Sequence, residues 1–267
     1  MKWVFLNTGY SSGETNMALD ERLASQLFSD GLDGVLRVYG WDPPCISLGY
    51  HQSLETLDLH KIRREGIDAV RRPTGGRTIL HWEELTYSVV IRAGGRSLTQ
   101  VYHHIGLALV RGLHRLTDEI SLSRPDPKSL PSQRPTSAIP CYASIARYEI
   151  QYRGKKLVGS AQRRYSFSRP AARSTPSGFD ECVLQHGSVL IGPAHRRLVE
   201  FLAVNEEGEV QALKKELEEK STELSTILNR RVEFDEVAQC VRAGFEEEWG
   251  VHFLDVLEGS EYPLTVH

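Results

Sequence analysis

The sequence contains no long hydrophobic run. None of its apolar segments approaches the roughly 20 residues that a membrane-spanning helix needs. The opening stretch, MKWVFL, is too short for the apolar core of a secretory signal and leads directly into Asn7. We therefore expect a cytoplasmic protein that does not associate with a membrane.

Paired cysteines and an excess of positive charge are also absent. The four cysteines, Cys45, Cys141, Cys182 and Cys240, lie far apart and form no CxxC motif, so a metal site built on paired cysteines is not expected. Without an export signal, free thiols in a reducing compartment are the default. The formal net charge of −3 does not favour a nucleic acid partner, because proteins that bind nucleic acid are commonly basic.

The sequence does contain enough apolar material for a core. Hydrophobic residues make up 40% of the chain, and no internal repeat or linker divides it, so we expect one domain over residues 1–267. Strand-like runs with short, hairpin-like spacings come first, and helical patterns surround them. This order indicates a mixed α+β fold and not an alternating βαβ fold.

Apolar runs rich in β-branched residues predict the strands. They cover residues 1–6, 35–39, 45–50, 67–70, 85–91, 148–152, 156–161 and 182–191. The run at 35–39 alternates like a half-buried strand, and residues 45–50 are expected to be its hairpin partner. Two stretches fit no element: a Pro- and Ser-rich loop over 121–140 and an exposed insertion over 165–181.

Apolar positions at helical spacing predict the helices. They follow a capping stretch at 11–15 and the capping Ser97, cover 54–64, and fill the C-terminal part 193–250, where residues 210–228 fit one helix. In the first helix the apolar face consists of Leu19, Leu23 and Leu27. Asp20 and its neighbours Glu21 and Arg22 are then expected to point into solvent.

One polar stretch, RRPTGGRTILH at residues 71–81, stands between two predicted strands, and we call it the Arg–Gly loop. Pro73 fixes one φ angle, whereas Gly75 and Gly76 permit positive φ and a close approach of the backbone. Such a loop can present backbone N–H groups and guanidinium groups to a carbonyl, carboxylate or phosphate. The same residues also fit a surface hairpin with solvated arginines, and the loop alone does not decide.

A second candidate site combines Cys141 with the stretch GKKLVGSA at 154–161. Cys141 follows a proline and the long loop, and its reactivity would depend on a nearby cation that lowers the pKa of the thiol. Lys156 begins a strand that ends in small residues, against which a ligand can lie. The alternatives are a small apolar loop residue at 141, as expected for the other three cysteines, and a solvated turn around the lysines.

Two further polar groups have a simple structural interpretation beside a functional one. Gln185, His186 and Gly187 interrupt an apolar strand, and a buried, hydrogen-bonded histidine explains them well. Arg163 and Arg164, close in sequence to Arg153 and Lys155, form a positive cluster. It can steer an acidic partner or can simply be a solvated face.

Three motifs then occur together and in order. NMALDE at 16–21 comes first, the Arg–Gly loop second, and GKKLVGSAQ at 154–162 last, followed by QHG at 185–187. Up to about His195, the chain resembles the catalytic domains of lipoate–protein ligases and biotin–protein ligases. The resemblance implies a class II synthetase-like fold of mixed, mostly antiparallel sheets packed with helices in a single catalytic domain.

The resemblance implies one of two chemistries. Ligases of this family activate lipoate with ATP, whereas octanoyltransferases take an octanoyl group from a carrier-protein thioester through a cysteine. The ligases usually have a third glycine where this chain has Arg77, and EELTYS at 83–88 looks like the transferase version. Trp82 stands where an acidic residue often follows the histidine in the transferases. Cys141 lies a short strand upstream of Lys156, as in the cysteine-dependent octanoyltransferases.

By this resemblance, Cys141 would accept octanoate from octanoyl–acyl carrier protein and pass it to a lysine of a lipoyl domain or of glycine-cleavage H protein. Lys156 would be the second catalytic residue, and no cofactor or metal is expected. Substrate would be bound by Arg71, Arg72, Thr74, Gly75, Gly76, Arg77, His81, Gly159, Ser160, Ala161, His186 and Gly187. We expect a monomer. The alternatives are an ATP-dependent lipoate–protein ligase, octanoyl transfer from H protein to lipoyl domains, and a non-catalytic carrier-binding module.

Overall fold

A large mixed sheet forms the centre of the computed structural model, which describes residues 1–123, 149–168, 179–203 and 207–254. Its strand order is β11-β1-β2-β6-β10-β9-β8-β7. The strands are β1 (Trp3–Ser11), β2 (Gly34–Trp41), β6 (Glu84–Arg92), β7 (Ile120–Leu122), β8 (Ile150–Tyr152), β9 (Lys155–Ser168), β10 (Phe179–Leu190) and β11 (Phe253–Leu254). Strand β1 runs parallel to both β2 and β11, and the other described neighbours are antiparallel. The predicted mixed, mostly antiparallel architecture is confirmed.

A second sheet has three short strands in the order β4-β3-β5. These are β3 (Cys45–Leu48), β4 (Asp68–Arg71) and β5 (Ile79–His81). The expectation that residues 45–50 pair with 35–39 is wrong. Strand β2 already lies between β1 and β6, so it has no free edge, and β3 pairs instead with β4 and β5.

Two of the helices begin beside serines in predicted capping positions, and the helix expected over 54–64 is divided into a 3₁₀ turn and a shorter α-helix. The helices are α1 (Gly13–Gln26), α2 (Leu59–Arg64), α3 (Leu98–Leu113), α4 (Glu207–Lys220), α5 (Leu224–Leu228) and α6 (Phe234–Trp249), with 3₁₀ turns η1 (Leu54–Thr56) and η3 (Pro193–Phe201). Ser12 caps α1, and Ser97 forms a capping box with Gln100 at α3. The single helix expected at 210–228 is interrupted, because the Thr222 N–H donates to the carbonyl of Lys156 at the sheet edge.

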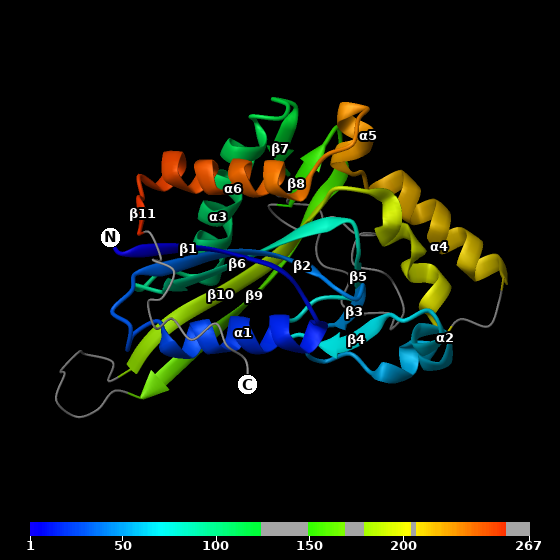
Figure 1. The fold of residues 1–267 in the computed structure, drawn as a ribbon, viewed down its shortest axis with the longest axis horizontal. Coiled ribbons are helices and arrows are strands. Elements are labelled where there is room, and N and C mark those ends of the chain that lie inside the picture. Colours follow the sequence, from blue (N-terminus) through cyan, green and yellow to red (C-terminus); the bar gives the residue numbers. More distant parts are fainter. Residues whose placement is uncertain (124–148, 169–178, 204–206, 255–267) are drawn as a thin grey trace.

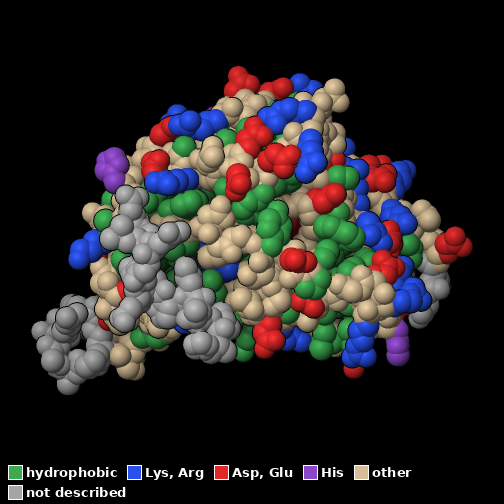
Figure 2. Space-filling model, in the orientation of Figure 1, with side chains coloured by type: hydrophobic (Ala, Val, Ile, Leu, Met, Phe, Trp, Pro, Cys, Tyr) green, Lys and Arg blue, Asp and Glu red, His purple; other side chains and the backbone are tan. Residues whose placement is uncertain are grey.

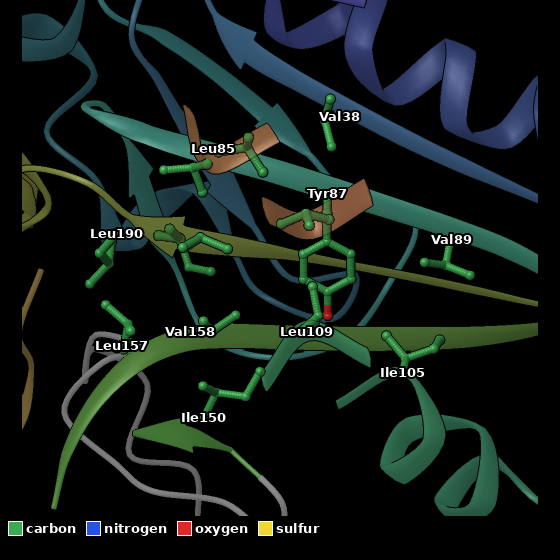
Figure 3. Close-up of a cluster of buried hydrophobic side chains, with 14 of the residues drawn as sticks. Val38, Leu85, Tyr87, Val89, Ile105, Leu109, Ile150, Leu157, Val158 and Leu190 are labelled. Carbon is green, nitrogen blue, oxygen red and sulfur yellow. The ribbon is translucent and has the colours of Figure 1, made fainter. Parts of the chain in front are cut away.

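The large sheet is covered on both faces (Figure 1): α1 lies on one side, and α3 and α6 lie on the other. Leu85, Tyr87 and Val89 of β6 lie on the α3 side, where Figure 3 shows them near Ile105 and Leu109. The alternate residues of β6 face the opposite way. Because both faces of the sheet are covered, every residue of β2 is buried. The expectation that β2 is half-buried is wrong.

Helices α3 and α6 approach each other at two glycines. A Cβ atom on Gly112 would lie 2.1 Å from the carbonyl oxygen of Cys240, and one on Gly244 would lie 2.2 Å from that of Ala108. No side chain fits at such distances, so the two backbones are in direct contact behind the sheet.

The expected exposed insertion at 165–181 is partly wrong. Strand β9 continues to Ser168, β10 begins at Phe179, and these two residues pair across the hairpin. Residues 169–178 lie outside the described residues. Of the expected loop at 121–140, the structure describes only 121–123, and residues 121 and 122 belong to β7. Cys141 also lies outside the described residues.

The surface seen in Figure 2 carries basic and acidic side chains in an intermixed pattern. This pattern agrees with a net charge close to balance. Among the described helices, none has both the length and the apolar character that crossing a membrane requires.

Candidate active site

A pocket lies between the small sheet with its Arg–Gly loop and the polar face of the large sheet. Its free volume is about 30 Å³, so the lining side chains are closely packed around it. Gly76 at its edge is exposed, whereas Tyr39 and Ser47 are fully buried, so the pocket leads from the loop into the interior.

Eight of the residues predicted to bind substrate line this pocket. They are Arg72, Gly76, His81, Gly159, Ser160, Ala161, His186 and Gly187. Thr74 does not line the pocket, but its hydroxyl forms a hydrogen bond with His186, which does. Gly75, Arg71 and Arg77 are not among the lining residues. Three stretches that are distant in sequence therefore meet at one pocket: the Arg–Gly loop, β9 and β10.

Arg72 holds the Arg–Gly loop from inside. Its guanidinium donates to the carbonyl of Gly75 at 2.8 and 3.1 Å and to that of Arg77 at 2.7 Å. It also donates to the carbonyl and the hydroxyl of Ser47 at 3.0 and 3.1 Å. Because Arg72 is only 3% exposed, the alternative of a hairpin with solvated arginines does not describe it.

Arg71 has a different position although it is the next residue. It is exposed, and its Nη1 donates to the carbonyls of Gly49, Tyr50 and Gln52. These bonds fix the turn after β3 and leave the side chain away from the lining of the pocket. Arg71 is the last residue of β4 and Arg72 follows the strand, so the two side chains leave the chain in different directions.

A buried ion pair lies beneath the α1 side of the pocket. Asp20 Oδ1 is 2.7 Å from Arg37 Nη1, and both side chains are buried. Asp20 Oδ2 also accepts from the Tyr39 hydroxyl at 3.0 Å and from His186 Nδ1 at 3.1 Å. His186 Nε2 is then 2.7 Å from the Thr74 hydroxyl. The expectation that Asp20 points into solvent is wrong.

The charges in this group follow from burial and pairing. Burial alone would raise the pKa of Asp20, but Arg37 and His186 together bring it below its usual value. Burial lowers the pKa of His186, despite the nearby carboxylate. A neutral His186 therefore donates from Nδ1 to ionised Asp20 and accepts from Thr74 at Nε2.

A second carboxylate–histidine pair lies under the small sheet. His81 Nδ1 is 2.8 Å from Glu84 Oε1, and His81 Nε2 is 2.7 Å from the Ser47 hydroxyl. Glu84 Oε1 also accepts from the hydroxyls of Thr86 and Ser188 at 2.6 and 2.7 Å. The ring of Trp41 stacks on His81, with centroids 4.1 Å apart.

Lys156 is buried beside an acidic partner. Its Nζ lies 2.5 Å from Glu149 Oε1, and the side chains are 1% and 5% exposed. Lys156 is three residues before Gly159 on β9 and is not among the lining residues. The other predicted catalytic residue, Cys141, lies outside the described residues, so the structure does not relate it to Lys156.

The three described cysteines are poorly suited to nucleophilic chemistry. Cys45, Cys182 and Cys240 are all buried. Burial raises the pKa of Cys182 to about 12, and it also raises the pKa values of Cys45 and Cys240. This confirms the expectation that these three are small apolar residues, because a thiol reacts as its thiolate.

Several pocket residues were missed from the sequence. They are Met17, Tyr39, Trp41, Ser47, Ile79, Thr86 and Ser188. One signal could have identified part of this wall: Glu84, Thr86 and Ser88 are polar at every second position of an otherwise apolar strand. A period-two polar row on a buried strand indicates a polar interior surface.

A family model described as the lipoyl protein ligase A/B catalytic domain matches residues 12–246. The chain belongs to this family. It is 34% identical to octanoyltransferase LipM of Kyrpidia tusciae, over 93% of this chain and 87% of the relative. It is 35% identical to octanoyltransferase LipM of Symbiobacterium thermophilum, with the same coverage of both chains.

Solved structures of this family share the fold. A bipartite lipoate protein ligase from Thermoplasma acidophilum has a TM-score of 0.68 at 22% identity, covering 96% of this chain and 86% of the other. Lipoate-protein ligase A bound with ATP has a TM-score of 0.67 at 22% identity, covering 96% and 88%. The predicted lipoate ligase-like fold is confirmed.

Membership of the lipoyl protein ligase A/B family and the similarity to octanoyltransferases make the protein an acyltransferase. Within the described ranges, no group of three or more His, Cys, Asp or Glu side chains is arranged to hold a metal ion. Hydroxyls, two histidines and a buried guanidinium line the pocket together with apolar groups such as Met17, Trp41 and Ile79.

Proposed function

We propose that this protein is an octanoyltransferase of protein lipoylation. It moves an octanoyl group from octanoyl–acyl carrier protein to a lysine of a lipoyl domain or of glycine-cleavage H protein. The observation that carries the proposal is the pocket between the Arg–Gly loop and strands β9 and β10. The similarity to proteins named octanoyltransferase LipM over 93% of the chain supports the choice of acyl group.

The pocket is proposed to hold the acyl chain. Each methylene of the chain that leaves water contributes about 0.8 kcal/mol. Gly187 packs closely against the neighbouring strand, because a Cβ atom on it would lie 2.5 Å from the carbonyl oxygen of Gly159. Gly76 at the exposed edge marks the end where the carbonyl group would lie.

The reaction is proposed to have two steps. The thiolate of Cys141 attacks the thioester carbonyl, a new carbon–sulfur bond forms, and the carrier leaves as its thiolate. The neutral amine of the acceptor lysine then attacks the acyl-enzyme. The Cys141 sulfur leaves, an amide forms, and one proton is released. No step requires ATP or a metal.

Elimination among the cysteines supports Cys141 as the nucleophile. The other three are buried and have raised pKa values, so little thiolate forms on them near neutral pH. Cys141 also stands a short strand upstream of Lys156, as the family resemblance leads one to expect.

Lys156 is proposed to assist both steps. A cation near Cys141 favours the thiolate, and near the incoming lysine it disfavours protonation of the amine by like-charge repulsion. It can also donate to the acyl carbonyl. The buried ion pair with Glu149 supports this role, because it fixes the position of Nζ.

The test is to incubate the purified protein with octanoyl–acyl carrier protein, without ATP, and to record its intact mass. We expect a gain of one octanoyl group, which the Cys141→Ala variant loses. Cys182→Ala is the matched control and should keep the adduct, because Cys182 is buried with a pKa of about 12. A Cys141→Ala protein that transfers octanoate at the normal rate would exclude this mechanism.

The same experiment separates the alternatives. A lipoate–protein ligase would need ATP and a free fatty acid and would tolerate the loss of Cys141. Replacing the donor with octanoylated H protein distinguishes the two octanoyl donors, since only the true donor should acylate the enzyme rapidly.

A further inference from the structure

A directed line of hydrogen bonds runs from the large sheet to the Arg–Gly loop. The carboxylate of Glu84 can only accept, so His81 must donate to it from Nδ1. With its proton on Nδ1, the His81 ring can accept at Nε2 from the Ser47 hydroxyl, which lies 2.7 Å away. Ser47 Oγ in turn accepts from Arg72 Nη1 at 3.1 Å. Every donor and acceptor in this line has one consistent direction.

Contacts from Thr86 and Trp41 hold Glu84 and His81, the first two residues of the line. Thr86 donates to Glu84 Oε1 and accepts from Trp41 Nε1 at 2.8 Å, and the Trp41 ring stacks on His81. Glu84, His81 and Ser47 are 4%, 5% and 0% exposed. Water therefore has little access to the line, and a hydrogen bond lost there is not replaced by solvent.

The end of the line sets the orientation of two peptide groups. Arg72 binds the carbonyl oxygens of Gly75 and Arg77. A trans peptide is planar, with its N–H opposite its C=O, so holding the Gly75 oxygen at Arg72 turns the Gly76 N–H the other way. Gly76 has φ near +96° and lines the pocket. A rotation of this peptide would instead bring a carbonyl dipole to the acyl group.

We propose that Glu84, His81 and Ser47 are positioning residues that hold Arg72 and thereby orient the loop N–H groups toward the acyl carbonyl. This inference rests on the proposed acyl transfer. Within it, these side chains do not touch the reacting atoms: they determine whether the loop stabilises the oxyanion that forms on the thioester oxygen.

The test compares Ser47→Ala with Ser47→Thr. Ser47→Ala breaks the line between His81 and Arg72, and we expect the rate of Cys141 acylation at saturating donor to fall roughly tenfold to a hundredfold. The donor concentration at half-maximal rate should change less than about twofold, because the loop acts on the transition state. Ser47→Thr keeps the hydroxyl and should restore most of the rate.

Ser88→Ala is the matched control. Ser88 is 1% exposed on the same face of β6, and its hydroxyl has no hydrogen-bond partner within the described residues. Deleting it removes a buried hydroxyl outside the line and should leave the acylation rate unchanged. Melting temperatures of all variants separate loss of fold from loss of orientation. Ser47→Cys, with its weaker donor, is the second variant if Ser47→Ala does not fold, and we expect it to acylate at an intermediate rate.

Nitrogen NMR of histidine-labelled protein gives a readout that needs no transfer activity. We expect the His81 ring to carry its proton on Nδ1, with the His81→Gln spectrum providing the assignment. A proton on Nε2, or equal acylation rates for Ser47→Ala and Ser88→Ala, would overturn the proposal. If the wild type forms no acyl-enzyme, the proposed function fails, and the tautomer still decides whether the line is directed as described.

Discussion

Two carboxylate–histidine–hydroxyl chains flank the pocket. Asp20, His186 and Thr74 form the one beside α1, and Glu84, His81 and Ser47 form the one beneath the small sheet. Both have the carboxylate at Nδ1 and the hydroxyl at Nε2. Both also end at the Arg–Gly loop, through Thr74 itself or through Arg72.

The two chains differ in whether a permanently charged cation lies beside the carboxylate. Asp20 has a buried guanidinium at 2.7 Å, whereas among the described residues only His81 is basic and within ion-pair distance of Glu84. Among the residues that the structure describes, none forms a hydrogen bond with Glu84 Oε2. We infer that the first chain mainly stabilises the fold and that the second mainly orients the loop, at lower cost to stability if it is disturbed.

The largest expected effect is a loss of stability when the first chain is broken. Arg37→Ala leaves Asp20 buried without its cation, which should lower the free energy of unfolding by about 3–5 kcal/mol. Urea unfolding measures it. Arg242→Ala is the control, because the partly exposed pair with Glu246 should be worth about 0–1 kcal/mol. Equal losses in the two variants would contradict the assignment of Asp20 as a stabilising ion pair.

The next effect is a dependence of stability on pH. Burial lowers the pKa of His186 below 6.5 and that of His195 to about 4, so below about pH 6.5 the unfolded chain binds protons that the folded chain does not. The free energy of unfolding should therefore fall as the pH falls from 6.5. The slope should be about 1.4 kcal/mol per pH unit for each histidine, until its folded pKa is reached.

Urea unfolding between pH 7.5 and pH 4.5 checks this slope. His195→Asn removes the contribution of His195, and the slope that remains reports on the Asp20–His186 chain. A stability that stays constant across this range in the wild type would contradict the burial of two neutral histidines.

The smallest expected effect concerns the length of the acyl chain that the pocket accepts. It tests Trp41, which stacks on His81 in the second chain. Trp41 lines the pocket and also an outer groove that contains Asp42 and Trp82, so it closes one end of the pocket. Trp41→Leu should favour decanoyl over octanoyl donors by about tenfold, because two further methylenes can be buried at about 0.8 kcal/mol each. Acylation rates with the two donors measure this preference.

Trp82→Leu is the matched control for this change. Trp82 lines the outer groove but not the pocket, so its loss should not alter the preference between donors. An unchanged preference in Trp41→Leu would show that the acyl chain ends elsewhere.

The sequence predicted the parts of the fold that depend on local pattern. Examples are the leucine face of α1, the capping stretch at 11–15, the capping Ser97 and the long strands β6 and β10. The motif residues in the Arg–Gly loop, β9 and β10 did meet at one pocket, although pattern alone could not show that they would.

The failures share a physical cause, because long-range pairing decided them. Asp20 has the sequence context of a solvated helix position, and only the buried Arg37 on β2 makes its burial stable. Residues 45–48 follow β2 closely, yet β2 has no free edge. The roles of Arg71 and Arg72 depend on which carbonyls lie within reach, which no sequence pattern shows.

The contact between Gly112 and Gly244 has a consequence for reading natural variation and mutational scans. Both positions exclude even a methyl group, since it would meet a backbone carbonyl about 2 Å away. They lie where α3 and α6 cross, on the face of the sheet opposite α1. A map of positions that tolerate no substitution would therefore mark this crossing as strongly as the pocket, and only assays that separate protein abundance from turnover would tell the two apart.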